Sequence, residues 1–93
     1  MYALVFTSRF IKSFRKLQRS GRFPLAKFEH ALTCLRGGEK LPANVLDHAL
    51  AGPLVEFREF HLDYDLLVQY KQDESRRIIT LSKIGTHAEL FGH

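Results

Sequence analysis

The stretch LVEFREFHLDYDLLVQYKQDESRRIITLS, residues 54–82, decides the fold of this 93-residue chain. Its apolar and aromatic residues recur in short runs that are typical of β-strands, and clusters of polar residues separate the runs. We predict three strands, over residues 54–61, 65–70 and 76–82, with a polar turn over residues 71–75. Because the connections are so short, the strands are expected to form an antiparallel meander.

The residues before this stretch have the period of helices. A β-prone segment over residues 1–6 predicts a first strand, and Thr7 or Ser8 can then cap a helix that ends at Gly21. Pro24 suits the first turn of a second helix, which a pair of glycines ends. The apolar stripes of the two helices are Phe10, Ile11, Phe14 and Leu17, and Leu25, Phe28, Leu32 and Leu35.

The order of these elements predicts the fold class. Residues 39–53 contain two prolines and read as a loop, and the tail over residues 85–93 is too short for an independent element. The order is therefore β-α-α-β-β-β, without a repeat or linker. We predict an α+β fold in which the two N-terminal helices pack on one face of a small, mainly antiparallel sheet, as a single domain over residues 1–93.

Composition limits the classes of function. Fourteen Lys and Arg against ten Asp and Glu give a net charge of +4 and a pI near 9.5, which suits a polyanionic partner. The single cysteine excludes a disulfide scaffold and a multi-cysteine zinc site, and Cys34 is expected in the core. The apolar runs are too short for a membrane span and the N-terminus does not resemble a signal peptide, so we expect a cytoplasmic protein without a membrane partner.

Part of the positive charge is concentrated on the first predicted helix. Lys12, Arg15, Lys16 and Arg19 follow one another at i, i+3, i+4 and i+7 and form a second stripe, turned toward solvent. By default such a stripe is a solvated helix face, and its alternative role is the binding of phosphates.

The C-terminal half concentrates side chains that can transfer protons. His61 and Asp65 flank the turn between two predicted strands, and Lys83 and His87 are expected just after the last strand. Such positions can converge at one rim of a meander. RNA cleavage through the neighbouring 2′-OH needs a base, an acid and a cation for the phosphate, and histidine titrates close to neutral pH. His48 and Glu59 are further polar groups of this kind.

Several of these residues have alternative interpretations. His61, Asp65 and His87 can also form a metal site, although their spacing is not a recognised ligand signature. Phe91 can stack on a nucleobase, or it can close the edge of the core together with Leu90. The remaining histidines, His30 and His93, are expected to be structural.

Four short motifs occur in a fixed order along the chain. They are Asp47-His48-x-Leu50-x-Gly52, Phe57-Arg58-Glu59-x-His61, Asp65-x-x-x-x-Tyr70 and Gly85-Thr86-His87-Ala88-x-Leu90-Phe91-Gly92. With the element order and the basic first helix, this series resembles the YafQ branch of the RelE/ParE toxin superfamily over nearly the whole chain. The last motif is the most specific. Proteins of this superfamily are bacterial type II toxins, and its YafQ and RelE branches cut messenger RNA on the translating ribosome.

The resemblance implies a role for each residue at a motif position. The implied catalytic residues, with His87 as the principal acid or base, are His48, His61, Asp65 and His87. Phe91 would engage a base of the substrate. Lys83 stands where the family commonly has Arg, and it keeps the charge without the bidentate fork. Leu66 stands where the best-known member of the branch has Trp, and leucine has no ring that could stack on the substrate.

Two further assignments concern arginine and the basic stripe. Arg58 stands where the superfamily often keeps an arginine, and it would either bind substrate or brace the sheet through a carboxylate. The predicted ribosome contacts are Lys12, Arg15, Lys16 and Arg19.

The resemblance therefore implies a ribosome-dependent endoribonuclease toxin of a type II toxin–antitoxin system, working without a metal or another cofactor. Its partners would be a cognate antitoxin, the ribosome and mRNA, with operator DNA bound only through the antitoxin complex. Two alternatives are a ParE-like toxin that inhibits DNA gyrase without catalysis, and a basic interaction module without toxicity. Three histidines and Asp65 count against the first, because a binding toxin needs no titrating groups at these positions.

Overall fold

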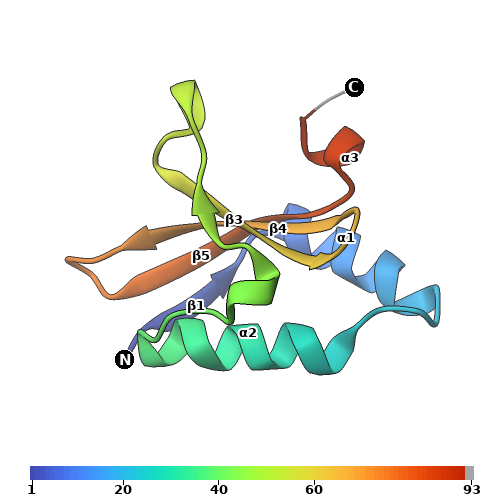
Figure 1. Ribbon diagram of the computed structural model, residues 1–93, viewed down its shortest axis with the longest axis horizontal. Coiled ribbons are helices and arrows are strands. Elements are labelled where there is room, and N and C mark those ends of the chain that lie inside the picture. Colours follow the sequence, from blue (N-terminus) through green and yellow to red (C-terminus); the bar gives the residue numbers. More distant parts are fainter. Residues whose placement is uncertain (92–93) are drawn as a thin grey trace.

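A five-stranded sheet with the strand order β1-β5-β4-β3-β2 runs through the molecule (Figure 1). The computed structural model of the chain describes residues 1–91. The strands are β1 (Ala3–Phe6), β2 (His48–Ala49), β3 (Phe57–Asp63), β4 (Leu66–Asp73) and β5 (Ile78–Gly85). β1 pairs with β5 in parallel and the other neighbours are antiparallel, so the predicted mainly antiparallel sheet is confirmed.

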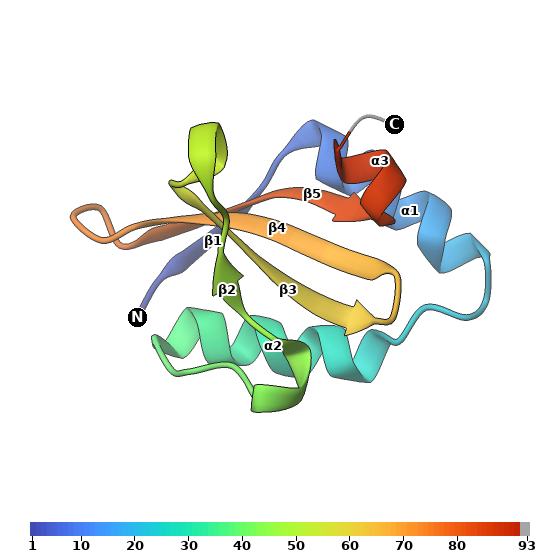
Figure 2. The ribbon, with the colours of Figure 1, turned by 45° about the horizontal axis from the view of Figure 1, so that its top comes forward.

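Two long helices pack on one face of this sheet, as the sequence predicts, and a short third helix follows the last strand (Figure 2). The helices are α1 (Ser8–Arg19), α2 (Leu25–Gly37) and α3 (His87–Phe91), and two 3-10 turns cover Ala43–Val45 and Gly52–Leu54. The core between helices and sheet includes Phe10, Phe28, Phe60, Tyr70 and Leu81, each at most 4% exposed. Burying a large apolar side chain contributes about 1.5–3 kcal/mol, so this aromatic core is the main stabilising feature.

Helix α1 begins where the sequence predicts. The Thr7 hydroxyl accepts a hydrogen bond from the Phe10 amide (3.1 Å) and donates one to the Ser82 carbonyl (2.8 Å), so this cap also ties the helix to β5. Ile11 lies at the edge of the predicted apolar stripe. It is 38% exposed, and it lines one hollow with Phe10 and Phe14 and another with Lys12 and Arg15.

The last two strands are longer than predicted. β4 continues to Asp73, and the turn lies after it, where the Asp73 carboxylate accepts hydrogen bonds from Ser75 and Arg76. Arg77 closes the turn in a left-handed conformation (φ 57°). β5 continues to Gly85, so the expectation that Lys83 follows the last strand was wrong.

The structure contains two elements that the sequence analysis missed. β2 lies within the predicted loop, and a strand of two residues has no period that a sequence can reveal. α3 lies in the tail that was predicted to form no element. Its first turn is closed by a capping box, in which the Thr86 amide donates to the Glu89 carboxylate (2.8 Å) and the Glu89 amide donates to the Thr86 hydroxyl (3.2 Å). Leu90, 5% exposed, anchors the helix.

A register shift between β4 and β5 decides which side chains share a face. Gln69 pairs with Lys83 and Tyr70 pairs with Leu81, so Ser82 is the extra residue of a bulge. Leu81 faces the helices, and in a regular strand Lys83 would face them too. The bulge turns Lys83 to the opposite face, which also carries Glu59 and His61.

Cys34 is a free, buried cysteine, as predicted. Gly92, the last residue of the fourth motif, and His93, which was expected to be structural, lie outside the described residues. Within residues 1–91, no helix combines the length and apolar character required to cross a bilayer.

Candidate active site

A histidine–aspartate pair joins the start of α3 to the turn between β3 and β4. One carboxylate oxygen of Asp65 accepts two hydrogen bonds from His87, one from the backbone amide (2.9 Å) and one from Nδ1 of the ring (2.7 Å). Because Nδ1 donates to Asp65, Nε2 of His87 is the nitrogen left to exchange a proton with a ligand. Both side chains are about half exposed, at 56% for His87 and 50% for Asp65.

The same contacts set the charge state of Asp65. The backbone amide of His87, and after it the imidazole, hold the pKa of the Asp65 carboxyl below its ordinary value of 3.8. Hydrogen bonds to the ionised form favour it, so Asp65 stays a carboxylate throughout the neutral range.

Three imidazole rings and a phenyl ring form a continuous row. The ring centroids of His48 and His61 are 5.9 Å apart, those of His61 and His87 are 6.0 Å apart, and those of His87 and Phe91 are 6.5 Å apart. The rings come from β2, β3 and α3. The structure thus brings together His48, His61, Asp65 and His87, the four residues expected to act together.

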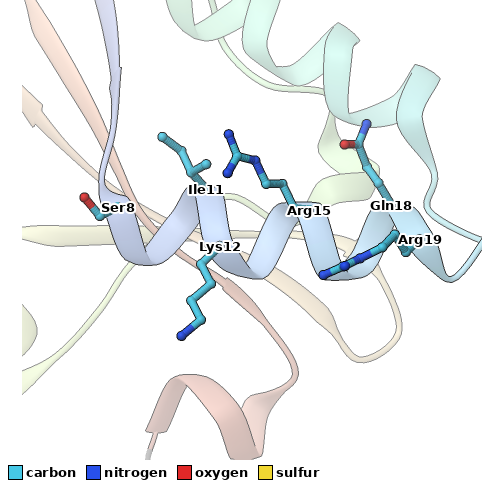
Figure 3. Close-up of a pocket in the computed structure, with 6 residues that line it drawn as sticks. All are labelled: Ser8, Ile11, Lys12, Arg15, Gln18 and Arg19. Atoms are coloured by element: carbon cyan, nitrogen blue, oxygen red, sulfur yellow. The ribbon is translucent and has the colours of Figure 1, made fainter.

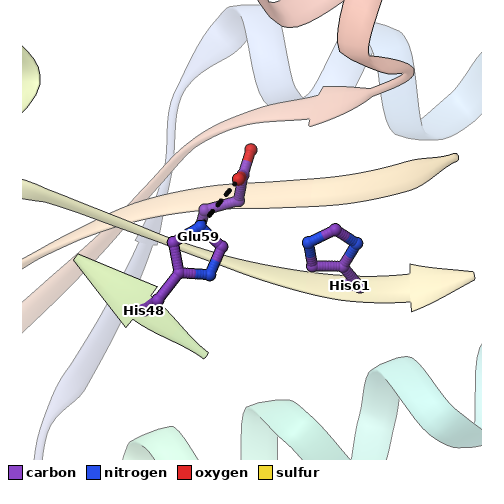
Figure 4. A group of neighbouring side chains, drawn as sticks. All are labelled: His48, Glu59 and His61. Atoms are coloured by element: carbon purple, nitrogen blue, oxygen red, sulfur yellow. Dashed lines mark ion pairs between the residues drawn. The ribbon is translucent and has the colours of Figure 1, made fainter. Parts of the chain in front are cut away.

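Glu59 is a further member of this cluster that the sequence analysis did not assign to the site. Its carboxylate is 5% exposed, with Oε2 3.2 Å from Nε2 of His48, and its Oε1 has no hydrogen-bond partner among the described residues (Figure 4). Nδ1 of His48 lies 2.7 Å from the Leu46 carbonyl oxygen, so both ring nitrogens face acceptors. The spacing of Glu59 and His61, two residues apart on one strand, was the available signal.

His48, Glu59 and His61 also have the chemistry of metal ligands. One ligand atom from each lies within 4.8 Å of the other two, and the three side chains face a common space (Figure 4). Two imidazoles and a carboxylate are a known ligand set for zinc, and the unpartnered Glu59 oxygen fits it. The metal site considered from the sequence had different members, because it placed Asp65 and His87 in the ligand set.

Lys83 lies on the face of the sheet that carries this cluster. Strand pairing places His48 beside Glu59, Glu59 beside Gln69, and Gln69 beside Lys83. Lys83 is half-buried, and among the described residues no carboxylate pairs with its ammonium group. This cation is therefore available to an anionic ligand on the histidine face.

Arg58 lies on the opposite face, apart from the histidines. Its guanidinium donates to both oxygens of Asp47, at 3.3 Å and 3.2 Å, and the Tyr70 hydroxyl donates to Asp47 at 2.8 Å. Burial, and secondly the contact with Asp47, raise the pKa of Tyr70. Of the two roles considered for Arg58, the structure provides the contacts for the bracing role.

Comparison with known proteins identifies the family. Residues 2–92 match the sequence model of a family described as "Bacterial toxin of type II toxin-antitoxin system, YafQ". The chain belongs to the YafQ family of toxins.

Individual relatives agree with this family. The mRNA interferase toxin YafQ of Escherichia coli K12 is 31% identical over 78 residues, which cover 83% of each chain. A metal-bound toxin from Helicobacter pylori is 32% identical and superposes with a TM-score of 0.90, covering 98% of this chain and 100% of the other. YafQ in the E. coli DinJ–YafQ complex is 27% identical, with a TM-score of 0.83 over 99% of this chain and 100% of the other.

This YafQ-family chain carries its basic stripe on the exposed side of α1. A surface cavity of about 1000 Å³ is lined by Lys12, Arg15 and Arg19, together with Ser8, Ile11 and Gln18 (Figure 3). Lys16 is exposed but does not line the cavity. Arg9, in the first turn of α1, donates to the Glu89 carbonyl of α3 (3.3 Å), so the basic helix begins beside the helix that carries His87.

Proposed function

We propose that this toxin is a ribosome-dependent endoribonuclease that cuts mRNA in the cytoplasm and thereby stops translation. The observation that carries the proposal is the His87–Asp65 pair, in which Nδ1 of His87 is bound and Nε2 is left free. The ring centroid of a second imidazole, His61, lies 6.0 Å from that of His87. Two neighbouring imidazoles are what a general acid and a general base require. The E. coli relative named an mRNA interferase supports the same substrate.

The proposed reaction is attack of the 2′-OH on the adjacent phosphate. One imidazole removes the 2′-OH proton, and another donates a proton to the 5′ oxygen that leaves. His87 is the principal proton carrier, Asp65 orients its ring and stabilises its cation, and His61 takes the complementary role. Lys83 and His48 offset the negative charge that grows on the phosphate oxygens.

We propose that this route needs no metal, because the paired imidazoles supply both proton-transfer roles. If a divalent ion binds this protein, the residues that would hold it are His48, Glu59 and His61. Such an ion would supply Lewis-acid charge to a phosphate oxygen, and it would compete with protons for two of the imidazoles.

The proposed requirement for the ribosome follows from the small number of side chains that could hold and orient RNA at this site. The active-site side chains lie at an open rim, and Leu66, which stands where the best-known member of the branch has Trp, packs against the core. A surface that orients RNA poorly gains most from a partner that presents the scissile phosphate in line with the 2′-OH. We propose that the ribosome is this partner and that Phe91, stacked beside His87, engages a base.

We also propose that a cognate antitoxin binds and inhibits this toxin, as suggested by the E. coli relative solved with DinJ. Any contact with operator DNA is proposed to occur only through that complex.

The test is a single-turnover cleavage assay on programmed ribosomes with His87→Gln. Loss of one general acid or base lowers the rate by roughly 10²–10⁴-fold, whereas glutamine keeps hydrogen-bonding capacity. We expect lost cleavage and lost growth arrest, with unchanged thermal melting. His30→Gln is the matched control, because His30 is exposed on α2 and makes no contact with the site. Near-normal cleavage by His87→Gln would contradict the assignment.

A further inference from the structure

A cavity of about 730 Å³ lies beside the catalytic pair, and its rim carries an aromatic residue with no role in the proposed chemistry. His61, Asp65 and His87 line this cavity, and so does Tyr64 at the tip of the turn between β3 and β4. The volume falls within the roughly 300–1,000 Å³ of pockets that hold small ligands. Tyr64 is 93% exposed, more than Leu46 at 60% in the same cavity wall.

The backbone that presents Tyr64 is held on both sides. The Asp63 carboxylate accepts a hydrogen bond from the Tyr64 amide (2.8 Å), and Asp65, the next residue, is bonded to His87. A register shift between His61 and Asp63 marks the start of this turn. The ring therefore projects from an anchored turn, so a ligand that stacks on it orders one side chain rather than a loop.

Phe91, the other side chain proposed to stack on a base, lies against the His87 ring and does not line this cavity. Leu66 is half-buried against the core and has no ring that could stack. Tyr64 is thus the aromatic residue, among the described residues, that faces this space.

A cation also lines the cavity. Lys27 belongs to α2, is half-buried, and is the one Lys or Arg among the described residues that line this space. An aromatic platform and an ammonium group in the same cavity match the two parts of a nucleotide, a flat base and an anionic phosphate.

We propose that this cavity is a nucleotide subsite, in which Tyr64 stacks on the base of a nucleotide next to the scissile phosphate and Lys27 binds its phosphate. The inference rests on the proposed ribonuclease function, because it names where the RNA lies relative to His61 and His87. Since stacking accepts every base, Tyr64 strengthens substrate binding more than it selects a sequence.

The first experiment measures binding without cleavage. The chain has no Trp, and its other two tyrosines, Tyr2 and Tyr70, are 6% and 2% exposed, so Tyr64 is the tyrosine that an oligonucleotide can reach. We expect a short 2′-O-methyl RNA, which cannot be cleaved through its 2′ oxygen, to quench tyrosine fluorescence in a saturable way. Absence of quenching with the wild-type protein at millimolar RNA would overturn the subsite.

The second experiment compares Tyr64→Ala, Tyr64→Phe and Lys27→Gln by the anisotropy of the same RNA carrying a dye. Loss of the ring is expected to weaken binding roughly 5- to 150-fold, whereas phenylalanine keeps the stacking surface and rescues it. Lys27→Gln should weaken binding and reduce its salt dependence. The matched controls are Val55→Ala and Lys40→Gln, because both residues are exposed and lie outside the cavity wall. Equal affinity of Tyr64→Ala and wild type would contradict the proposal.

Cleavage on programmed ribosomes separates this inference from the function on which it rests. Failure of the wild-type protein to cut would count against the ribonuclease itself, whatever Tyr64 does. If the wild type cuts, Tyr64→Ala should raise KM with kcat within a few fold, at an unchanged melting temperature. An unchanged KM would overturn the role of Tyr64 and leave the ribonuclease proposal intact.

Discussion

At the scale of single residues, the contact that matters most is made by one oxygen atom. Oδ1 of Asp65 accepts from both the backbone amide and the imidazole of His87, so the same carboxylate anchors α3 and orients the ring proposed to carry the proton. The hydrogen bond from the backbone amide remains when the side chain of His87 is replaced. One variant at His87 can therefore separate the contributions of the amide and of the imidazole to the pKa of Asp65.

We predict that the pKa of Asp65 rises only part of the way to its ordinary value of 3.8 in His87→Gln. The larger cause of the lowered pKa is the backbone amide, which the substitution keeps, and the smaller cause is the imidazole, which it removes. The measurement is a ¹³C NMR titration of the side-chain carboxyl. A return of the pKa to 3.8 would show that the imidazole alone lowers it, and no change would show that the imidazole contributes nothing.

The same shift gives the sign of an effect on stability. Because the folded-state pKa is lowered, the stabilisation from ionised Asp65 is present above pH 3.8 and is lost as the pH falls through the lowered value. The contribution of Asp65 ionisation to the docking of α3 should thus not change with pH in the neutral range.

The resemblance implied a set of four site residues, and the structure places these four side chains close together. His48, His61, Asp65 and His87 do come together, whereas Glu59 was not assigned to the site, although its spacing to His61 places both side chains on one face of a strand. Its importance follows from its burial and from the unpartnered Oε1, which only three-dimensional structure reveals.

At the scale of elements, long periodic segments were predictable and short ones were not. The two long helices and the three-strand meander follow from their hydrophobic periods. β2 is too short to have a period, and the bulge at Ser82, which places Lys83 on the face that carries His61, depends on pairing between β4 and β5. For α3, the capping pair of Thr86 and Glu89 was present in the sequence and was overlooked.

The basic stripe of α1 is the element for which we predict a ribosome contact. Replacing Lys12, Arg15, Lys16 and Arg19 with Gln should weaken ribosome binding, and each lost phosphate contact should reduce the slope of log affinity against log salt by roughly 0.7–0.9. The measurement is ribosome co-sedimentation across a salt series.

A control variant removes the same charge elsewhere on the surface. It replaces Arg36, Lys40, Lys71 and Arg76, which are all exposed, with Gln. Equal salt slopes for the two variants would show that the stripe acts only through net charge. An unchanged affinity of the α1 variant for the ribosome would show that the stripe is only a solvated helix face.

At the scale of the whole molecule, the two faces of the sheet differ, because one belongs to the hydrophobic core and the other carries the histidines. One face packs against α1 and α2, and the other carries the histidine cluster, with the basic side of α1 next to α3. An inhibitor can therefore cover the rim that carries the histidines without disturbing the core.

We predict that the cognate antitoxin covers both the proposed active-site rim and the basic side of α1 with an acidic segment that becomes ordered on binding. The net charge of +4 and the exposure of the stripe favour this arrangement. Hydrogen exchange of the complex should show protection on α1 and around His61 and His87. Protection confined to surfaces away from both regions would mean that inhibition acts at a distance.

The chemistry of the cut ends of mRNA tests the central claim most directly. Attack by the 2′-OH leaves a 2′,3′-cyclic phosphate on one product and a 5′-hydroxyl on the other, and a route through imidazoles needs no metal bound to the toxin. We predict these ends from mRNA on programmed ribosomes, and not from free mRNA, when the toxin is first stripped of metal with EDTA and then freed of the chelator, because the ribosome itself requires Mg²⁺. Products with 5′-phosphate ends, or a loss of cleavage by the stripped toxin that added Zn²⁺ restores, would contradict the account.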